Sequence, residues 1–191
     1  MGGPAFDLVL SKLRCPSVRP GTVRRSSLIE RLTRDDGRPV VSVVAPAGYG
    51  KTTLLGQWAE RSGDAFAWVS VDEGDNDPKV FLSYVAAALD AVEPVGRRVF
   101  DALASPVSSV PGSVVPRLAA ALAARAAPVV LVVDDVHLLG HAECRARCRS
   151  WLIMCRPARG WCWPGGPGRR CGSRGCAPRA RSPRSAPMTS R

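Results

Sequence analysis

The chain has 191 residues, of which 46% are hydrophobic, 6% aromatic and 23% charged. This composition is typical of an ordinary α/β domain, and it excludes a collagen, a coiled coil, a disulfide-rich mini-protein and a chain that is disordered throughout. The longest apolar stretch, residues 118–136, is interrupted by charged residues and a proline, so we expect no membrane-spanning helix and no membrane partner. The N-terminus lacks the pattern of a signal peptide, which predicts a cytoplasmic protein.

The net charge of +11 arises entirely at the end of the chain. Residues 1–140 carry 15 basic and 15 acidic side chains, whereas residues 141–191 carry 12 arginines, one acid and six of the seven cysteines. A strongly basic charge usually indicates affinity for nucleic acid, but here that indication applies to the last segment alone.

A phosphate-binding loop is predicted between a strand at 40–45 and a helix at 54–61. Glycines in such a loop let backbone N–H groups surround phosphate oxygens at the start of a helix. Lys51 would reach the β- and γ-phosphates, and the hydroxyl of Thr52 would ligate Mg²⁺. Ala45 stands where the general pattern has its first glycine. The residues that we assign to nucleotide binding in this loop are Ala47, Gly48, Tyr49, Gly50, Lys51, Thr52 and Thr53.

A second strand is predicted at 67–71, followed by an acidic turn at 72–78. Asp77 is the expected N-cap and Pro78 the first residue of an amphipathic helix that extends to about residue 92. The four acids of the turn have two interpretations. They form a metal site or, as is more common, a solvated turn.

Residues 105–116 contain three prolines and four serines and predict a loop, after which helical spacing resumes over 114–125. A buried strand over 129–134 then ends in Asp134 and Asp135, the Walker B pattern. Asp134 would hold Mg²⁺ together with Thr52. Asp135 is the candidate catalytic residue, because a second carboxylate can orient or polarise an attacking water.

This order of motifs resembles the MalT-like regulators, LuxR-family ATP-dependent transcription activators of the STAND class of P-loop ATPases. The resemblance covers residues 11–140, and its most specific part is the acidic turn followed by the helix that contains Phe81 and Tyr84. It implies that Arg25, in a Val-x-Arg segment, lies beside the nucleotide. It also implies an ATP/ADP switch with slow hydrolysis at best, self-association of the nucleotide-binding domain in a full-length parent, and DNA binding only through domains for which 191 residues leave no room.

The predicted fold is therefore α/β, a P-loop NTPase parallel sheet with flanking helices, truncated after the Walker B strand. The predicted parts are an entry segment (1–36), a partial P-loop ATPase domain (37–140) and a disordered tail (141–191). By the resemblance, the sheet has strand order 5-1-4-3-2, with 40–45 as strand 1, 67–71 as strand 2 and 129–134 as strand 3. Strand 4 belongs between strands 1 and 3. Its absence predicts a chain that is unstable or prone to aggregation and that binds Mg-ATP weakly or not at all.

The tail has three interpretations: an Arg-rich nucleic-acid-binding arm, a zinc module, or translation in the wrong reading frame. None of its cysteine gaps is the C-x2-C of a tight zinc knuckle. Shifting the frame over Gly160–Trp163 gives [Leu/Val/Met]-Val-Leu-Ala, an apolar strand, so a frameshift fits the composition best. Two alternative functions follow, a small nucleic-acid-binding protein acting through the tail or a non-functional gene fragment.

Overall fold

The computed structural model describes residues 7–33, 41 and 43–140. The predicted tail, with its zinc, nucleic-acid and frameshift interpretations, lies outside the described residues. So do residues 40 and 42 of the predicted first strand. All of the described residues fall within one compact unit of the chain.

The sheet consists of two parallel strands, β1 (Ala65–Ser70) and β2 (Val129–Asp134). Their register pairs Ala65 with Val129 and Ser70 with Asp134. The strands predicted at 67–71 and 129–134 are thereby confirmed, and so is their position as neighbours. The β-branched residues of β2 suit a strand that is covered on both faces.

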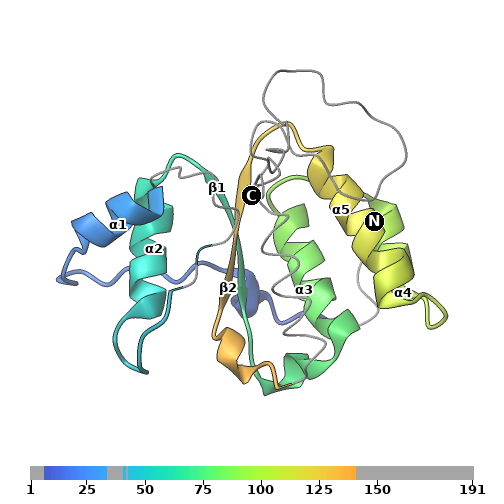
Figure 1. The fold of residues 1–191 in the computed structure, drawn as a ribbon, viewed down its shortest axis with the longest axis horizontal. Helices are drawn as coiled ribbons and strands as arrows, with labels where there is room; N and C mark the ends of the chain where they lie inside the picture. Colours follow the sequence, from blue (N-terminus) through green and yellow to red (C-terminus); the bar gives the residue numbers. More distant parts are fainter. Residues whose placement is uncertain (1–6, 34–40, 42, 141–191) are drawn as a thin grey trace, which may run out of the picture. The chain divides into compact units, whose positions relative to one another are not determined.

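One face of the sheet is covered by three helices, α3 (Pro78–Asp90), α4 (Arg97–Ala104) and α5 (Val115–Ala123) (Figure 1). Alternate side chains of β1 point into this layer, because successive residues of a strand face opposite sides. The core formed here is almost free of solvent contact. Its most deeply buried members include Val69, Phe81, Leu82, Val85, Leu89, Val114 and Leu118.

The helix predicted after the acidic turn is α3, and its start is confirmed in detail. The carboxylate of Asp77 accepts hydrogen bonds from the N–H groups of Lys79 and Val80, at 2.8 and 3.0 Å, and Pro78 opens the helix. This N-cap satisfies donors that the first turn of a helix leaves without partners.

The prediction of a loop over 105–116 is wrong in part. Residues Val110–Val114 form a short π-helical turn, η3, that leads into α5. The Ser109 hydroxyl caps this turn by accepting a hydrogen bond from Gly112 N–H at 3.1 Å. Two of the buried side chains of the core, Val110 and Val114, come from η3, so tertiary packing overrides the local proline and serine signals.

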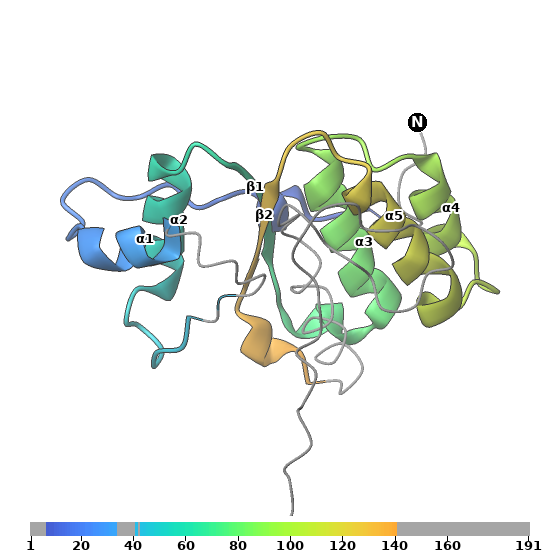
Figure 2. The same ribbon diagram turned by 45° about the horizontal axis from the view of Figure 1, so that its top comes forward.

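The other face of the sheet is covered by α1 (Ser26–Thr33) and α2 (Lys51–Arg61), and the second view shows the two helix layers on opposite sides of the strands (Figure 2). A second, smaller core lies here, formed by Ile29, Leu32, Leu54 and Trp58. Trp58 packs edge-to-face on Phe66 of β1, with ring centroids 5.1 Å apart. These contacts confirm a sheet with flanking helices.

The strand predicted over 40–45 is wrong for the residues that the structure describes. Residues 41 and 43–45 have an irregular backbone, and Val44 is 89% exposed. A cavity of about 420 Å³ lies between this segment and the edge of β2. A strand needs a neighbour to take its backbone hydrogen bonds. Among the described residues, 43–45 form no backbone–backbone hydrogen bond with another segment.

Candidate functional site

The predicted phosphate loop has the backbone conformation expected of a phosphate-binding loop. Gly48 and Gly50 have φ of 79° and 72°, in the left-handed region that favours glycine, and α2 begins directly after them at Lys51. The first N–H groups of α2 therefore face the loop without helical partners, which suits an anion. Of the other predicted loop residues, Tyr49 is 62% exposed and Thr53 lies in the first turn of α2.

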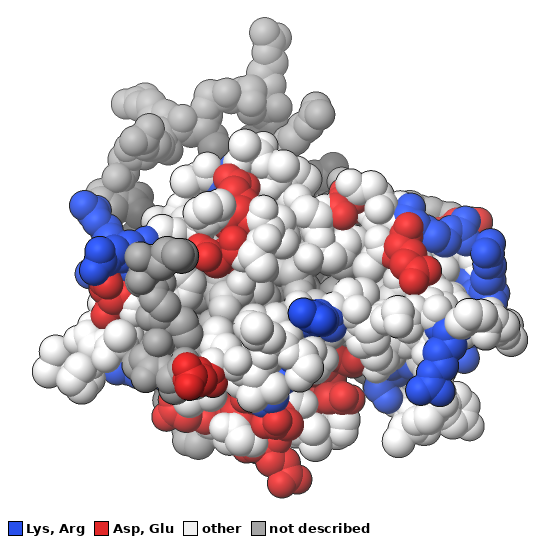
Figure 3. Space-filling model, turned by 180° about the vertical axis from the view of Figure 1, so that it is seen from behind, with Lys and Arg blue, Asp and Glu red and all other residues white. Residues whose placement is uncertain are grey.

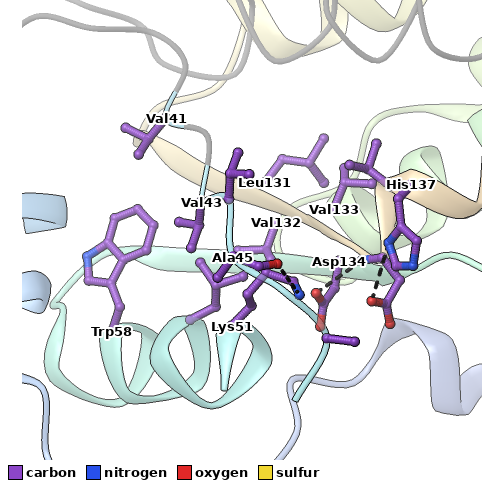
Figure 4. Close-up of a pocket in the computed structure, with 15 residues that line it drawn as sticks. Val41, Val43, Ala45, Lys51, Trp58, Leu131, Val132, Val133, Asp134 and His137 are labelled. Atoms are coloured by element: carbon purple, nitrogen blue, oxygen red, sulfur yellow. Dashed lines mark hydrogen bonds and ion pairs between the residues drawn. The ribbon is translucent and has the colours of Figure 1, made fainter. Parts of the chain in front are cut away.

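The ammonium group of Lys51 is bound within the loop itself. Its Nζ donates hydrogen bonds to the backbone carbonyls of Ala45, at 3.0 Å, and Pro46, at 3.1 Å. Figure 4 shows the lysine turned toward Ala45, at the end of the cavity where Asp134 also lies. Because the contact uses a main-chain oxygen, alanine in place of the usual first glycine does not remove it.

The structure brings together the two residues predicted to hold Mg²⁺. The hydroxyl of Thr52, at the start of α2, donates to Oδ2 of Asp134, at the end of β2, over 2.6 Å. Asp134 is only 4% exposed, so its carboxylate is held in a nearly dry position. A hydroxyl and a carboxylate are hard oxygen ligands of the kind that Mg²⁺ requires, and the pair fits this ion.

Asp135 lies beside this pair in a different setting. Its backbone is left-handed, with φ of 55°, and its N–H donates to Oδ1 of Asp134 at 3.0 Å. The Asp135 side chain is 45% exposed, and its Oδ1 lies 3.8 Å from Nδ1 of His137. The exposed carboxylate can therefore contact water, while Asp134 is confined to the interior.

Arg25 approaches the loop from the entry segment. A Cβ added to Gly50 would lie 3.5 Å from Nη2 of Arg25, so the guanidinium rests against the loop just before α2. The predicted residues Arg25, Gly50, Lys51, Thr52 and Asp134 thus lie around one end of α2. This juxtaposition joins segments more than 100 residues apart in the sequence.

Two residues of α2 that the sequence did not single out hold the entry segment in place. Gln57, only 5% exposed, accepts a hydrogen bond from Arg25 N–H at 3.2 Å and donates one to the Val23 carbonyl at 3.0 Å. A Cβ on Gly56 would lie 3.1 Å from the Pro16 carbonyl, a tight contact, so a larger residue would crowd the entry segment at this point. The available signal was a polar side chain between Leu54 and Trp58 on the buried face of α2.

Of the two interpretations of the acidic turn, the structure favours the solvated turn: Asp72, Glu73 and Asp77 are exposed, and Asp75 alone of the four acids is buried. The segment forms a 3-10 turn, η2 (Glu73–Asn76), and another such turn, η1 (Leu10–Leu13), brings Lys12 onto it. Lys12 Nζ lies 2.7 Å from Asp72 Oδ2 and 2.8 Å from Oδ1 of the buried Asp75. No cluster able to hold a metal occurs in the described part of the chain. The feature that the sequence did not predict is the ion pair of Lys12 with the buried Asp75. Acidic side chains gather along the lower edge of the face shown in Figure 3.

The ion pair between Lys12 and Asp72 changes the pKa of both groups. Burial by itself lowers the pKa of Lys12, but hydrogen bonds to Asp72 and Asp75 outweigh it, and the pKa is raised above the ordinary 10.5. The hydrogen bond from Lys12 holds the pKa of Asp72 below its ordinary 3.8, against a smaller effect of burial. The pair therefore stabilises the contact between the N-terminal segment and the turn when both groups are charged.

The chain is similar to known proteins over most of its length. The model of the AAA domain family matches residues 33–159. The chain is 36% identical, over 76% of its length, to proteins named HTH-type transcriptional regulator MalT, from Klebsiella pneumoniae subsp. pneumoniae and from Cronobacter sakazakii. It spans about 16% of the length of these relatives.

A separate finding concerns membranes: in the described ranges, no helix combines the length and the apolar character needed to cross one. The loop geometry, the Thr52–Asp134 contact and the family match agree with one another. On this evidence, the chain belongs to the AAA domain family of P-loop ATPases.

Proposed function

We propose that this chain binds ATP and ADP, with Mg²⁺, at the phosphate loop, and that the bound nucleotide is the switch of a transcription regulator. The observation that carries the proposal is the hydrogen bond between Thr52 and Asp134, with Lys51 next to Thr52 in the chain. The buried carboxylate of Asp134 and the half-buried Thr52 and Lys51 lie at the start of a helix, where a phosphate group is favoured.

In this proposal, the basic residues of the site bind phosphate and the oxygen ligands bind Mg²⁺. Lys51 and the N–H groups of the loop would bind phosphate oxygens, and Arg25 would add a second positive charge from the entry segment. Thr52 and Asp134 would hold Mg²⁺. When bound, this ion neutralises charge on the β- and γ-phosphates.

Asp135 is proposed to orient a water for hydrolysis. Its carboxylate reaches solvent and is adjacent to the predicted ion site, which is what a general base requires. Its one close basic neighbour among the described residues is the imidazole of His137. We expect slow turnover, as the resemblance implies, which suits a switch rather than a metabolic ATPase.

The regulator role rests on the names of the relatives, which are HTH-type transcriptional regulators. Because the match covers about 16% of those proteins, contacts with DNA and self-association are proposed for a longer parent protein. This chain would contribute the nucleotide-dependent step.

The test is calorimetric titration of the chain with Mg-ATP, comparing wild type with Lys51→Ala. Loss of charge-assisted contacts worth roughly 1.5–3 kcal/mol should lower the affinity by about tenfold or more. Lys79→Ala is the matched control, because Lys79 Nζ binds the Ser105 carbonyl and lies outside the loop. Equal affinities for wild type and Lys51→Ala would reject the proposed site.

The alternative of nucleic-acid binding through the Arg-rich tail has a different signature. Affinity for nucleic acid should fall steeply with salt and should be unchanged in Lys51→Ala. A chain that binds nucleic acid in this way and shows no saturable binding of ATP would replace the proposal.

A further inference from the structure

We infer that Gln57 is a positioning residue, which holds Arg25 against the phosphate loop and so couples the entry segment to nucleotide binding. The inference rests on the proposed function and adds to it a residue of α2 that lies two turns from the loop. Gln57 itself does not touch the loop in the structure; it acts through the backbone of Arg25.

The contact is specific in its chemistry. Arg25 presents a backbone N–H and Val23 a backbone carbonyl, and the Gln57 amide satisfies both, at 3.2 and 3.0 Å. A side-chain amide carries a donor and an acceptor on one rigid group, which a carboxylate or an alkyl chain of the same size lacks. The amide thereby fixes the backbone on both sides of residue 24.

The burial of Gln57 makes this arrangement rigid. Gln57 is 5% exposed, whereas Arg25 and Val23 lie at the surface. The buried Gln57 is held by its surroundings, and its hydrogen bonds therefore determine where the exposed residues Val23 and Arg25 lie. A buried amide is also expensive to leave unpaired, so the segment is held where both hydrogen bonds can form.

Holding the Arg25 backbone in place also limits the positions of the Arg25 guanidinium group. Fixing the Arg25 backbone fixes the origin of its side chain, whose Nη2 would lie 3.5 Å from a Cβ on Gly50. Long basic side chains have many rotamers, and a fixed origin reduces the number that must be lost when a phosphate binds. Gln57 therefore strengthens a contact that Arg25 makes.

Other contacts along α2 hold the entry segment without reaching Arg25. Glu60 accepts a hydrogen bond from Val18 N–H at 3.3 Å, and Arg61 donates one to the Ser26 hydroxyl at 3.1 Å. These contacts provide a matched comparison: they attach the same segment to the same helix, but they do not fix the Arg25 backbone.

The test is a double-mutant cycle on Mg-ATP affinity in the full chain, using Gln57→Leu, Arg25→Ala and the combined variant. Gln57→Leu should lower the affinity by about three- to tenfold, and Arg25→Ala by about tenfold. In the Arg25→Ala background, Gln57→Leu should change the affinity by less than about twofold, because its effect passes through the lost guanidinium. Gln57→Glu, which keeps the acceptor for Arg25 N–H, should restore part of the affinity.

The control is Arg61→Ala, which should leave the affinity within about twofold of wild type. Additive effects of Gln57→Leu and Arg25→Ala would overturn the inference, since a general structural role acts equally in both backgrounds. Wild-type affinity in Gln57→Leu would also overturn it.

Amide hydrogen exchange at Arg25 separates this inference from the proposed function. Gln57→Leu should speed exchange at that amide in the absence of nucleotide, by about tenfold. If wild type does not bind Mg-ATP, the proposed function fails and the positioning role fails with it. The exchange result then shows whether the hydrogen bond itself exists.

Discussion

Two layers of helices cover the sheet, and they are built in different ways. The layer of α3, α4 and α5 forms a core in which Leu82, Val85 and Leu118 have no exposed surface. The layer of α1 and α2 has a small core, and beside it a cavity of about 420 Å³ separates residues 41 and 43–45 from β2. The Thr52–Asp134 hydrogen bond connects this second layer to β2, and the Gln57–Arg25 hydrogen bond attaches the entry segment to α2.

The difference separates stability from ligand binding within one domain. Apolar burial is nondirectional and large in sum, so the first layer carries most of the folding free energy. The second layer carries the predicted ligand residues, which need donors and acceptors in fixed positions rather than a filled interior. Substitutions in the two layers should therefore have different readouts.

The largest effect is expected from restoring the alternative reading frame, which would add [Leu/Val/Met]-Val-Leu-Ala as a strand beside β2. Burying about two apolar side chains should contribute roughly 3–6 kcal/mol to the free energy of unfolding. We expect a cooperative thermal transition in the repaired chain and none in the present one. A scrambled segment of equal length is the control. A cooperative melt of the present chain as a soluble monomer, with a midpoint that ATP raises, would contradict this expectation.

Next in size is the loss of a core side chain. Leu82→Ala should lower the free energy of unfolding by about 2–5 kcal/mol, because a well-packed site cannot collapse around the space left. Leu55→Ala makes the same chemical change at a residue that lines the cavity, and it should cost clearly less. Urea denaturation followed by circular dichroism measures both. Like the stability measurements that follow, it is made on the chain with the repaired reading frame, where a cooperative transition is expected. Equal losses would mean that the two layers are packed alike.

A smaller effect on stability, with a specific effect on ligand binding, is expected from Thr52→Val. This variant keeps the branched shape but leaves the buried Asp134 carboxylate without its hydroxyl donor, which should cost about 1–3 kcal/mol. It should also abolish the dependence of nucleotide affinity on Mg²⁺, as measured by titration with and without the ion. Thr53→Val is the stability control, expected within about 0.5 kcal/mol of wild type. Retained Mg²⁺ dependence would remove Thr52 from the ion site.

The smallest effect concerns pH and the ion pair between Lys12 and the acidic turn. Because the folded-state pKa of Asp72 is lowered, its stabilising contribution is complete above 3.8 and is lost as pH falls through the lowered value. The raised pKa of Lys12 has the opposite consequence: its contribution is present below 10.5 and is lost as pH rises through the raised value.

Lys12→Met should therefore flatten the stability profile at both extremes of pH, as measured by urea midpoints across the range. Its effect should be modest, because Asp72 is more than half exposed and solvent screens the pair. Asp64→Asn, which removes an exposed acid outside the turn, is the control. An unchanged profile in Lys12→Met would show that other groups set the dependence on pH.

The parts of the fold that follow from local sequence signals were predictable. The Asp77–Pro78 start of α3 and the apolar run of β2 lie within a few residues of their signals. The strand over 40–45 fails because a strand depends on a partner from elsewhere in the chain, and α4 was not predicted because its eight residues give a short pattern.

The candidate site likewise contains some residues that the sequence predicts and others that it does not. Thr52 and Asp134 were predictable because each belongs to a motif with a fixed neighbourhood. Gln57 was not, since one polar residue in a helix has no spacing to recognise. The pairing of Lys12 with Asp75 joins residues 63 apart and required the tertiary fold.

The two carbonyls that hold Lys51 make any ligand of the loop a competitor. The ammonium has three N–H donors, of which the oxygens of Ala45 and Pro46 take two. A phosphate can use the third donor directly, and it gains further contacts only by exchanging with these two tethered oxygens. The measured affinity then depends on how much stronger the contacts of Lys51 with phosphate are than its contacts with the two carbonyls. A ligand with little negative charge gains little by replacing the carbonyls. The loop should therefore bind nucleoside di- and triphosphates, which carry enough negative charge, and should not bind nucleosides that share the same base.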